Sequence, residues 1–138
     1  MDPELLKERG VVIEAHLARI RETLPEDPVT FTLGTDTVDV VSLHLLFAIQ
    51  VVLDLSIFAC IHFGLQAPAS YDDAVGRLAH AGRITDSLAD RLEKAATFRD
   101  AFVHAFDQID AASIYRAARV LPDDLRMFMA DLGRQLGE

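Results

Sequence analysis

The chain has 138 residues, of which half are hydrophobic and a quarter are charged. This length and composition exclude a disordered chain and predict one folded domain, residues 1–138, with a substantial hydrophobic core. The net charge of −9 argues against nonspecific wrapping of nucleic acid, because an acidic surface repels phosphate at long range. A local basic cleft for RNA remains compatible with this charge, because salt screens the long-range repulsion more than it screens close contacts with phosphate.

Cysteine content and the first residues indicate the compartment. Cys60 is the only cysteine, so an internal disulfide is excluded, which suits a reducing cytosol. The N-terminal residues MDPELLKERG are acidic and polar and do not resemble a secretory signal, so we expect a cytoplasmic protein. Four other candidate ligands, His16, His44, His62 and His80, show no ligand-like pairing along the sequence. We therefore expect neither a metal nor another cofactor.

The first predicted element is a helix that opens at Asp2, with Pro3 in the first turn, where proline is tolerated. Its apolar residues follow three- and four-residue steps as far as Pro25. The next segment, PEDPVTFTLGTD, contains two prolines and a glycine and is predicted to be a connection. A short extended piece at Val29–Leu33 is compatible with it.

The most apolar segment runs from Val38 to Leu65 and is long enough to span a bilayer. Asp54 lies near its centre, and a carboxylate at the membrane midplane is costly without a pore or a partner. We therefore favour a long bundle helix over a membrane span. We expect this helix to be buried on nearly every side and to lie at a dimer interface.

Three further helices complete the prediction. Ser70 offers an N-cap for a short helix through His80, and Thr85 or Ser87 caps a longer helix that runs to about Asp107. The final helix begins after an aspartate at position 110, and the proline at position 122 is expected to kink or split it. The predicted fold class is therefore all-α, a bundle of five to six helices.

The stretch FRDAFVHAF at residues 98–106 places an arginine where a hydrophobic residue belongs. Apolar residues from Leu88 to Phe106 follow helical steps, and Arg99 lies in the middle of their stripe. A guanidinium cannot lose its charge, so its burial requires a partner. That partner could be a carboxylate, with Asp54 as the candidate, a second subunit, or an anionic ligand such as a phosphate.

Three segments in a fixed order resemble the HepT-like branch of the HEPN superfamily. They are AIQVVLDLSIFACIHFGLQAP, SYDDAVGRLAHAGRI and FRDAFVHAFDQID. They match the family's AIQ-x-x-x-D-I helix, AP-x-S-Y turn and FRN-x-x-VH-x-Y-x-x-ID segment, over roughly Val38 to Leu132. The resemblance implies a HEPN-type helical homodimer that cleaves RNA without a metal. It also implies a toxin whose partner is a minimal nucleotidyltransferase antitoxin of the MntA type.

The resemblance further implies that Arg99 and His104 form the catalytic pair, in a cleft to which both subunits contribute. Histidine titrates near operating pH and so suits proton transfer, whereas arginine supplies fixed charge and a bidentate phosphate fork. Asp100 lies four residues before His104 on one helical face and could orient the imidazole. Five residues turn a helix by about 140°, so Arg99 and His104 do not share a face and two copies are required.

The chain departs from the family pattern at Phe106, where many relatives carry the tyrosine that the antitoxin modifies with AMP. A phenyl ring has no hydroxyl to accept AMP. Ser42 and Leu43 also stand where relatives often carry charged residues. Two alternatives therefore accompany the nuclease prediction. One is a catalytically inactive HEPN domain that binds a nucleotide or a nucleotidyltransferase-like partner, and the other is a purely structural dimer.

Overall fold

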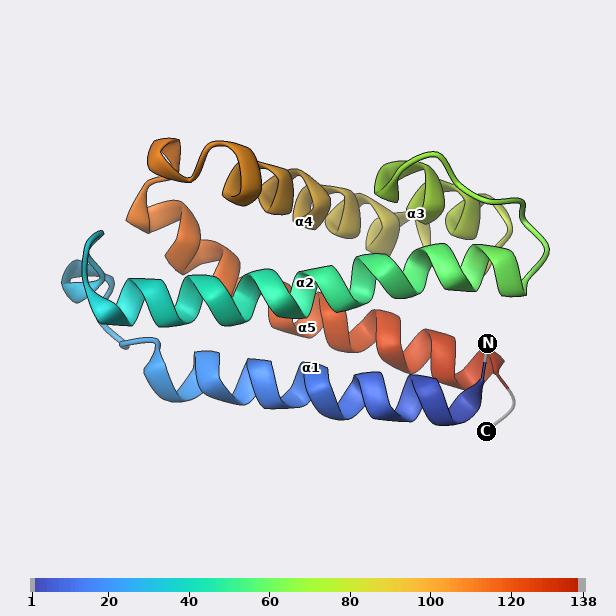
Figure 1. The fold of residues 1–138 in the computed structure, drawn as a ribbon, viewed down its shortest axis with the longest axis horizontal. Coiled ribbons are helices and arrows are strands. Elements are labelled where there is room, and N and C mark those ends of the chain that lie inside the picture. The colour runs from blue at the N-terminus through green and yellow to red at the C-terminus, as the bar shows by residue number, and fades with distance from the viewer. Residues whose placement is uncertain (1, 137–138) are drawn as a thin grey trace.

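The computed structural model describes residues 2–136 and contains five α-helices joined by short connections (Figure 1). The helices are α1 (Pro3–Thr23), α2 (Asp36–His62), α3 (Tyr71–His80), α4 (Asp86–His104) and α5 (Ala111–Gln135). Two short 3₁₀ helices lie between them, η1 (Pro28–Thr30) and η2 (Phe106–Gln108). No strand occurs among residues 2–136, which confirms the predicted all-α class.

Every α-helix begins at a residue whose side chain accepts a hydrogen bond from the first turn. These N-caps are Asp2, Thr35, Ser70, Thr85 and Asp110. Such caps satisfy backbone N–H groups that have no partner within the helix. The predicted starts of the first, third, fourth and fifth helices are therefore confirmed, with Thr85 rather than Ser87 as the cap of α4.

Two local predictions were wrong, and a third was wrong in one of its alternatives. The extended piece at Val29–Leu33 is absent, because Asp27 caps residues 28–30 as the 3₁₀ helix η1. Helix α4 ends at His104 rather than near Asp107, since Ala105 leaves the helical conformation with φ −148° and η2 follows. Helix α5 runs through Pro122 without a split, because buried side chains before and after the proline hold both parts against the core, whereas the alternative of a kink stays a prediction.

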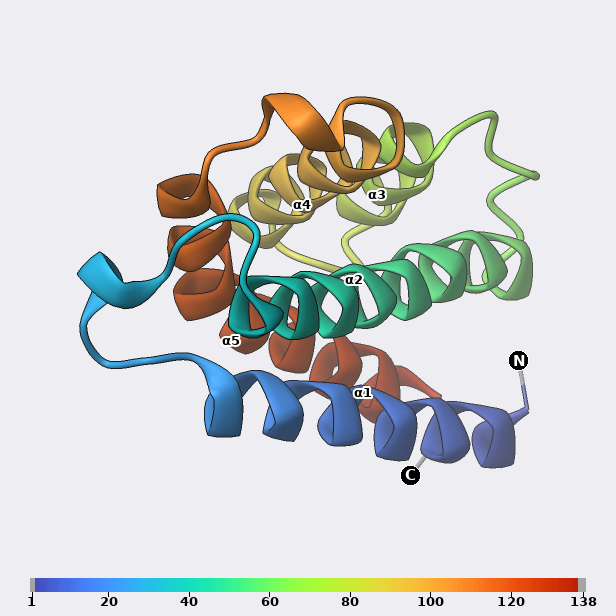
Figure 2. The ribbon, with the colours of Figure 1, turned by 60° about the vertical axis from the view of Figure 1, so that its left-hand side comes forward.

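Helix α2 is the central element of the bundle and packs against each of the other four helices. In both views, α3 and α4 lie on one side of α2 and α1 lies on the other (Figures 1 and 2). Helix α5 starts beside the end of α4 and runs behind α2 to the end of the molecule where α1 begins. Helix α2 is apolar and long enough to cross a membrane, and half of its most apolar stretch is buried inside the bundle.

One face of α2 remains uncovered. Leu43, Phe47, Phe58 and Ile61 are between 44% and 55% exposed, and their spacing places them within about 60° of one another around the helix. We call these four residues the α2 stripe. The prediction that this helix is buried on nearly every side includes a dimer interface, so it stays a prediction; within residues 2–136 the α2 stripe is exposed.

Candidate active site

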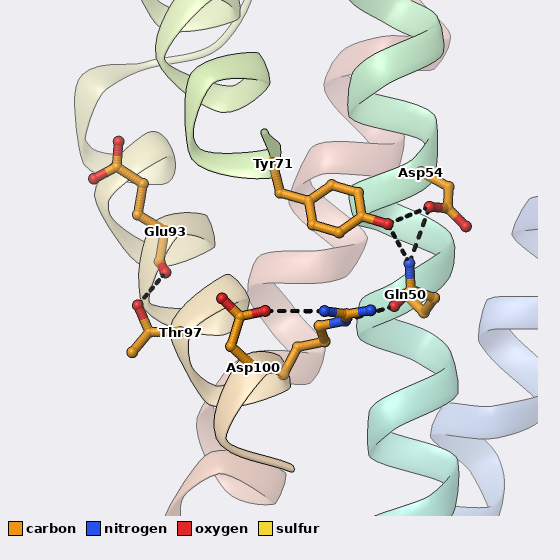
Figure 3. A network of polar contacts seen from close by, with 7 residues as sticks. Gln50, Asp54, Tyr71, Glu93, Thr97 and Asp100 are labelled. Carbon is orange, nitrogen blue, oxygen red and sulfur yellow. Dashed lines mark hydrogen bonds and ion pairs between the residues drawn. The ribbon is translucent and has the colours of Figure 1, made fainter. Parts of the chain in front are cut away.

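Arg99 bridges the gap between α4 and α2. Its Nε donates to Oε1 of Gln50 at 2.9 Å, and its Nη1 lies 3.0 Å from Oδ1 of Asp100 (Figure 3). The Arg99 side chain is 23% exposed, so it is half-buried but still reaches the surface. The guanidinium therefore has a fixed orientation and retains donors that can reach a ligand.

Gln50 connects Arg99 to α3. Arginine is only a donor, so the carbonyl of Gln50 must face it and the amide nitrogen must point away. That nitrogen donates to Oδ1 of Asp54 at 2.9 Å and to the hydroxyl of Tyr71 at 2.6 Å. The Tyr71 hydroxyl donates in turn to Oδ1 of Asp54 at 2.8 Å. We call Arg99, Gln50, Asp54 and Tyr71 the Arg99 network.

The aromatic ring of Tyr71 lies beside the guanidinium of Arg99. Its ring centroid lies 5.6 Å from Cζ of Arg99, within the range of a cation–π contact. Burial, and then the hydrogen bond to the Asp54 carboxylate, raise the pKa of Tyr71 above its ordinary value. The hydroxyl is therefore protonated at neutral pH and serves as a hydrogen-bond donor in the network.

Asp54 is not the buried partner that the sequence suggested for Arg99. The carboxylate is exposed, and Gln50 lies between it and the guanidinium. Gln50 and Asp54 fall on the same face of α2 as the α2 stripe, near the middle of its length. The Arg99 network therefore interrupts an apolar surface at its centre.

His104 is the last residue of α4 and its side chain is exposed. Within residues 2–136 the imidazole makes no hydrogen bond or ion pair, and Asp100 bonds to Arg99 instead. In the single chain, Arg99 is thus held against α2 while His104 lies free at the end of α4. The orienting role of Asp100 remains a prediction.

Three phenylalanine side chains contact one another near the C-terminal end of α4. The rings of Phe98 and Phe102 meet edge to face with centroids 4.6 Å apart, and Phe102 stacks on Phe106 at 5.5 Å. Phe102 is buried, whereas Phe106 and Val103 are about half exposed beside His104. The position that carries a tyrosine in many relatives is thus a solvent-exposed phenyl ring.

A shallow cleft of about 360 Å³ adjoins the Arg99 network. Tyr71 and Asp100 form part of its wall, together with Ile57 of α2 and Ala96 of α4. The cleft contains both apolar surface and acceptor oxygens.

Sequence reasoning missed the roles of two residues. Neither Gln50 nor Tyr71 was predicted to be a site residue. The turn motif before α3 carried the signal for Tyr71, since a tyrosine directly after the capping serine recurs in the family pattern. For Gln50 the signal was its position one turn before Asp54 on the same face of α2.

The prediction that the histidines form no pair was wrong for His16 and His44. Their Nδ1 atoms lie 2.9 Å apart, between α1 and α2. The two residues are 28 positions apart in the sequence, so only the packing of α1 on α2 brings them together. Among the described residues, no group of three or more histidine, cysteine or acidic side chains could hold a metal.

The fold is similar to that of several solved structures. A tri-AMPylated Shewanella oneidensis HEPN toxin in complex with an MNT antitoxin is 21% identical, with a TM-score of 0.86 over 97% of this chain and 99% of that one. A toxin–antitoxin structure with AMP-PNP is 21% identical, with a TM-score of 0.84 over 95% and 98%. YutE of Bacillus subtilis, a cytosolic protein of unknown function, is 20% identical, with a TM-score of 0.82 over 99% and 91%.

At such low identities these likenesses show the fold alone. A comparison with curated protein sequences gives no match. The sequence pattern of the family described as Ribonuclease HepT-like, in contrast, matches residues 13–132. Because this match covers most of the chain, the protein belongs to the HepT-like ribonuclease family.

Proposed function

We propose that this protein is a metal-independent endoribonuclease toxin of a HepT/MntA-type toxin–antitoxin pair that acts in the cytoplasm. Membership of the HepT-like family supports this function. So do the similar structures, which are described as toxins in complex with their antitoxins. The observation that carries the proposal is the Arg99 network, which fixes a cation at the centre of an uncovered helix face.

In the proposed mechanism Arg99 binds the scissile phosphate. Nε and Nη1 already have protein partners, and Nη2 makes no hydrogen bond to any residue in the range 2–136. The N–H groups of Nη2 are therefore available to donate a hydrogen bond to a phosphate oxygen. Fixed positive charge at this point stabilises the extra negative charge of the pentavalent transition state.

His104 is proposed to transfer the protons. Cleavage of RNA without a metal requires a base for the ribose 2′-hydroxyl and an acid for the leaving oxygen. Histidine is suited to both tasks near neutral pH. The exposed position of His104, without an intramolecular partner, leaves its ring free to approach a phosphate bound elsewhere.

The two groups are proposed to meet across a homodimer. The α2 stripe offers four exposed apolar side chains on both sides of the Arg99 network, and such an apolar surface is typical of an interface. A two-fold axis through this surface would bring Arg99 of one chain toward His104 of the other. The proposed dimer thus solves the problem that one helix directs the two residues to different sides.

A minimal nucleotidyltransferase of the MntA type is the proposed antitoxin. Phe106 cannot accept AMP, so we propose that this antitoxin acts by contact at the cleft or by modification of another group. The competing function is a catalytically inactive domain that binds a nucleotide or such a partner in the same cleft. Phe106 beside His104 is the observation that favours it.

Cleavage of RNA in the presence of a chelator tests the proposal. The purified protein is expected to cut RNA in EDTA, and Arg99→Ala and His104→Ala are each expected to lower the rate by about 10²–10⁴-fold. His80→Ala is the matched control, because His80 is an exposed histidine at the end of α3. RNA left equally intact by the wild-type protein and both variants would contradict cleavage and favour the binding domain.

A further inference from the structure

The paired imidazoles of His16 and His44 form a cluster that the proposed function does not use. His16 lies on α1 and His44 on α2, with ring centroids 5.2 Å apart and ring planes inclined by 44°. Both side chains are half-buried, and the ring of Phe47 lies 5.5 Å from that of His16. The pair lies between α1 and α2, whereas Gln50 of α2 is bonded to residues of α3 and α4.

A contact of 2.9 Å between two Nδ1 atoms requires that one ring carries a proton there and the other presents a lone pair. Burial, and then the neighbouring His44, lower the pKa of His16 below its ordinary value. If both rings hold their single proton on Nε2, both Nδ1 lone pairs become available to a shared ion.

The distance between the two nitrogens discriminates among metals. With metal–nitrogen bonds of about 2.0–2.1 Å, two ligands at 90° lie about 2.9 Å apart, and two ligands at the tetrahedral angle lie about 3.3–3.4 Å apart. The observed 2.9 Å matches the separation expected for two ligands at a right angle. Right angles are the preference of tetragonal Cu²⁺ and of Ni²⁺, whereas Zn²⁺ in proteins is usually tetrahedral.

We propose that His16 and His44 bind one divalent ion of the Cu²⁺ or Ni²⁺ type through their Nδ1 atoms. Since the described residues offer no third histidine, cysteine or acidic ligand, water completes the coordination. The ion therefore exchanges with solvent. It also joins α1 to α2 directly, next to Phe47 at the edge of the α2 stripe.

Metal titration of the full-length protein tests the proposal. The protein is prepared without a histidine tag, since a tag would itself bind these ions, and Cu²⁺ or Ni²⁺ is titrated by calorimetry. One ion per chain is expected, bound more tightly than Zn²⁺. At an ion concentration of about 100 times the Kd, the midpoint of thermal unfolding should rise by roughly 5–10 °C, because only the folded protein holds the pair together.

Matched variants identify the ligands. His16→Gln and His44→Gln each retain an amide that can bond to the remaining ring, and each is expected to weaken binding by about tenfold or more, since even loss of an outer-shell partner costs about 10–100-fold. His80→Gln, which removes an unrelated exposed histidine, should bind as the wild type does. Equal affinity in all four proteins would overturn the proposal.

Electron paramagnetic resonance of the wild-type protein with Cu²⁺ gives a readout that needs no variant. The expected spectrum is tetragonal, with coupling to two ring nitrogens. A spectrum of the hydrated ion, or coupling to a single nitrogen, would also overturn the proposal. Because RNA cleavage is proposed to proceed in a chelator, either proposal can fail while the other stands.

Discussion

At the scale of single residues, Gln50 joins the three helices of the candidate site. Its carbonyl accepts from Arg99 on α4, and its amide donates to Tyr71 on α3. Gln50 thus supplies a neutral acceptor to Nε, whereas the Asp100 carboxylate already pairs with Nη1. A second carboxylate in place of Gln50 would lower the affinity of Arg99 for a phosphate, since it would compete for the cation.

Gln50→Leu is expected to lower RNA cleavage by about 10–100-fold, because Nε of Arg99 loses its acceptor and only Asp100 then holds the guanidinium. Initial cleavage rates in EDTA measure the effect. Tyr71→Phe is the graded control: it removes the hydroxyl but keeps the ring beside Arg99, so its loss should be smaller. Wild-type rates in Gln50→Leu would show that the network does not position Arg99.

The sequence identified Arg99 but not its partner, for a physical reason. A charged residue within an apolar stripe is visible in the periodicity of one helix, whereas its partner depends on how two helices pack. Gln50 and Asp54 lie one turn apart on the same face of α2, and only the rotation of α4 against α2 selects Gln50. The His16–His44 pair was invisible for the same reason.

At the scale of elements, the connection after α2 determines where Tyr71 lies. Asp73 on α3 accepts from the backbone N–H of Ala69 at 2.8 Å and from Nε of Arg77 at 3.0 Å. Arg77 also donates to the carbonyl of Leu65. These bonds tie the loop between α2 and α3 to the first turn of α3, which carries Tyr71 of the Arg99 network.

The bonds from Arg77 and then Ala69 lower the pKa of Asp73 below its ordinary value. Because the folded state favours the ionised form, Asp73 stabilises the protein above the unfolded pKa, and this contribution is lost as pH falls through the lower folded pKa. Asp73→Asn should therefore be less stable than the wild type at pH 7, and the difference should shrink in acid.

Urea unfolding of the wild type and Asp73→Asn, from pH 7 down to acidic pH, measures the difference in unfolding free energy. Asp72→Asn is the control, because Asp72 is an exposed neighbour in the same turn. A difference in unfolding free energy between Asp73→Asn and the wild type that stays constant with pH would contradict the proposed role of the Asp73 carboxylate.

Helix starts were easier to predict than helix ends. Ser70, Thr85 and Asp110 cap their helices through local bonds to residues three positions later, and local chemistry is visible in the sequence. The end of α4 at His104 has no comparable signal. The continuity of α5 through Pro122 depends on burial of the side chains around it, which overrides the local preference.

At the scale of the whole molecule, the fold agrees with the family that three ordered motifs suggested. The homodimer stays a prediction, since the structure of one chain shows only the surface that a second chain would cover. Leu43, Phe47, Phe58 and Ile61 form that surface, with the Arg99 network between them. Two copies would bury it and enclose the candidate site together.

Phe47→Glu and Phe58→Glu are each expected to convert a dimer into a monomer, because each places a charge within the apolar α2 stripe. Light scattering of the purified proteins gives their mass. Val29→Glu is the control, since Val29 is an exposed apolar residue of η1 outside the stripe. A wild-type protein that is monomeric at high concentration would contradict the interface.

Mixing of two inactive variants tests the shared cleft most directly. Arg99→Ala and His104→Ala are each purified, combined under conditions that exchange subunits, and assayed for RNA cleavage in EDTA. If each cleft takes Arg99 from one chain and His104 from the other, a mixed dimer contains one intact cleft and should have about half the activity of a wild-type dimer. After complete exchange at equal concentrations, about half of the dimers are mixed, so the mixture should recover about a quarter of the wild-type activity. If the mixture stays as inactive as its components while subunits exchange, the two residues do not act together across the interface.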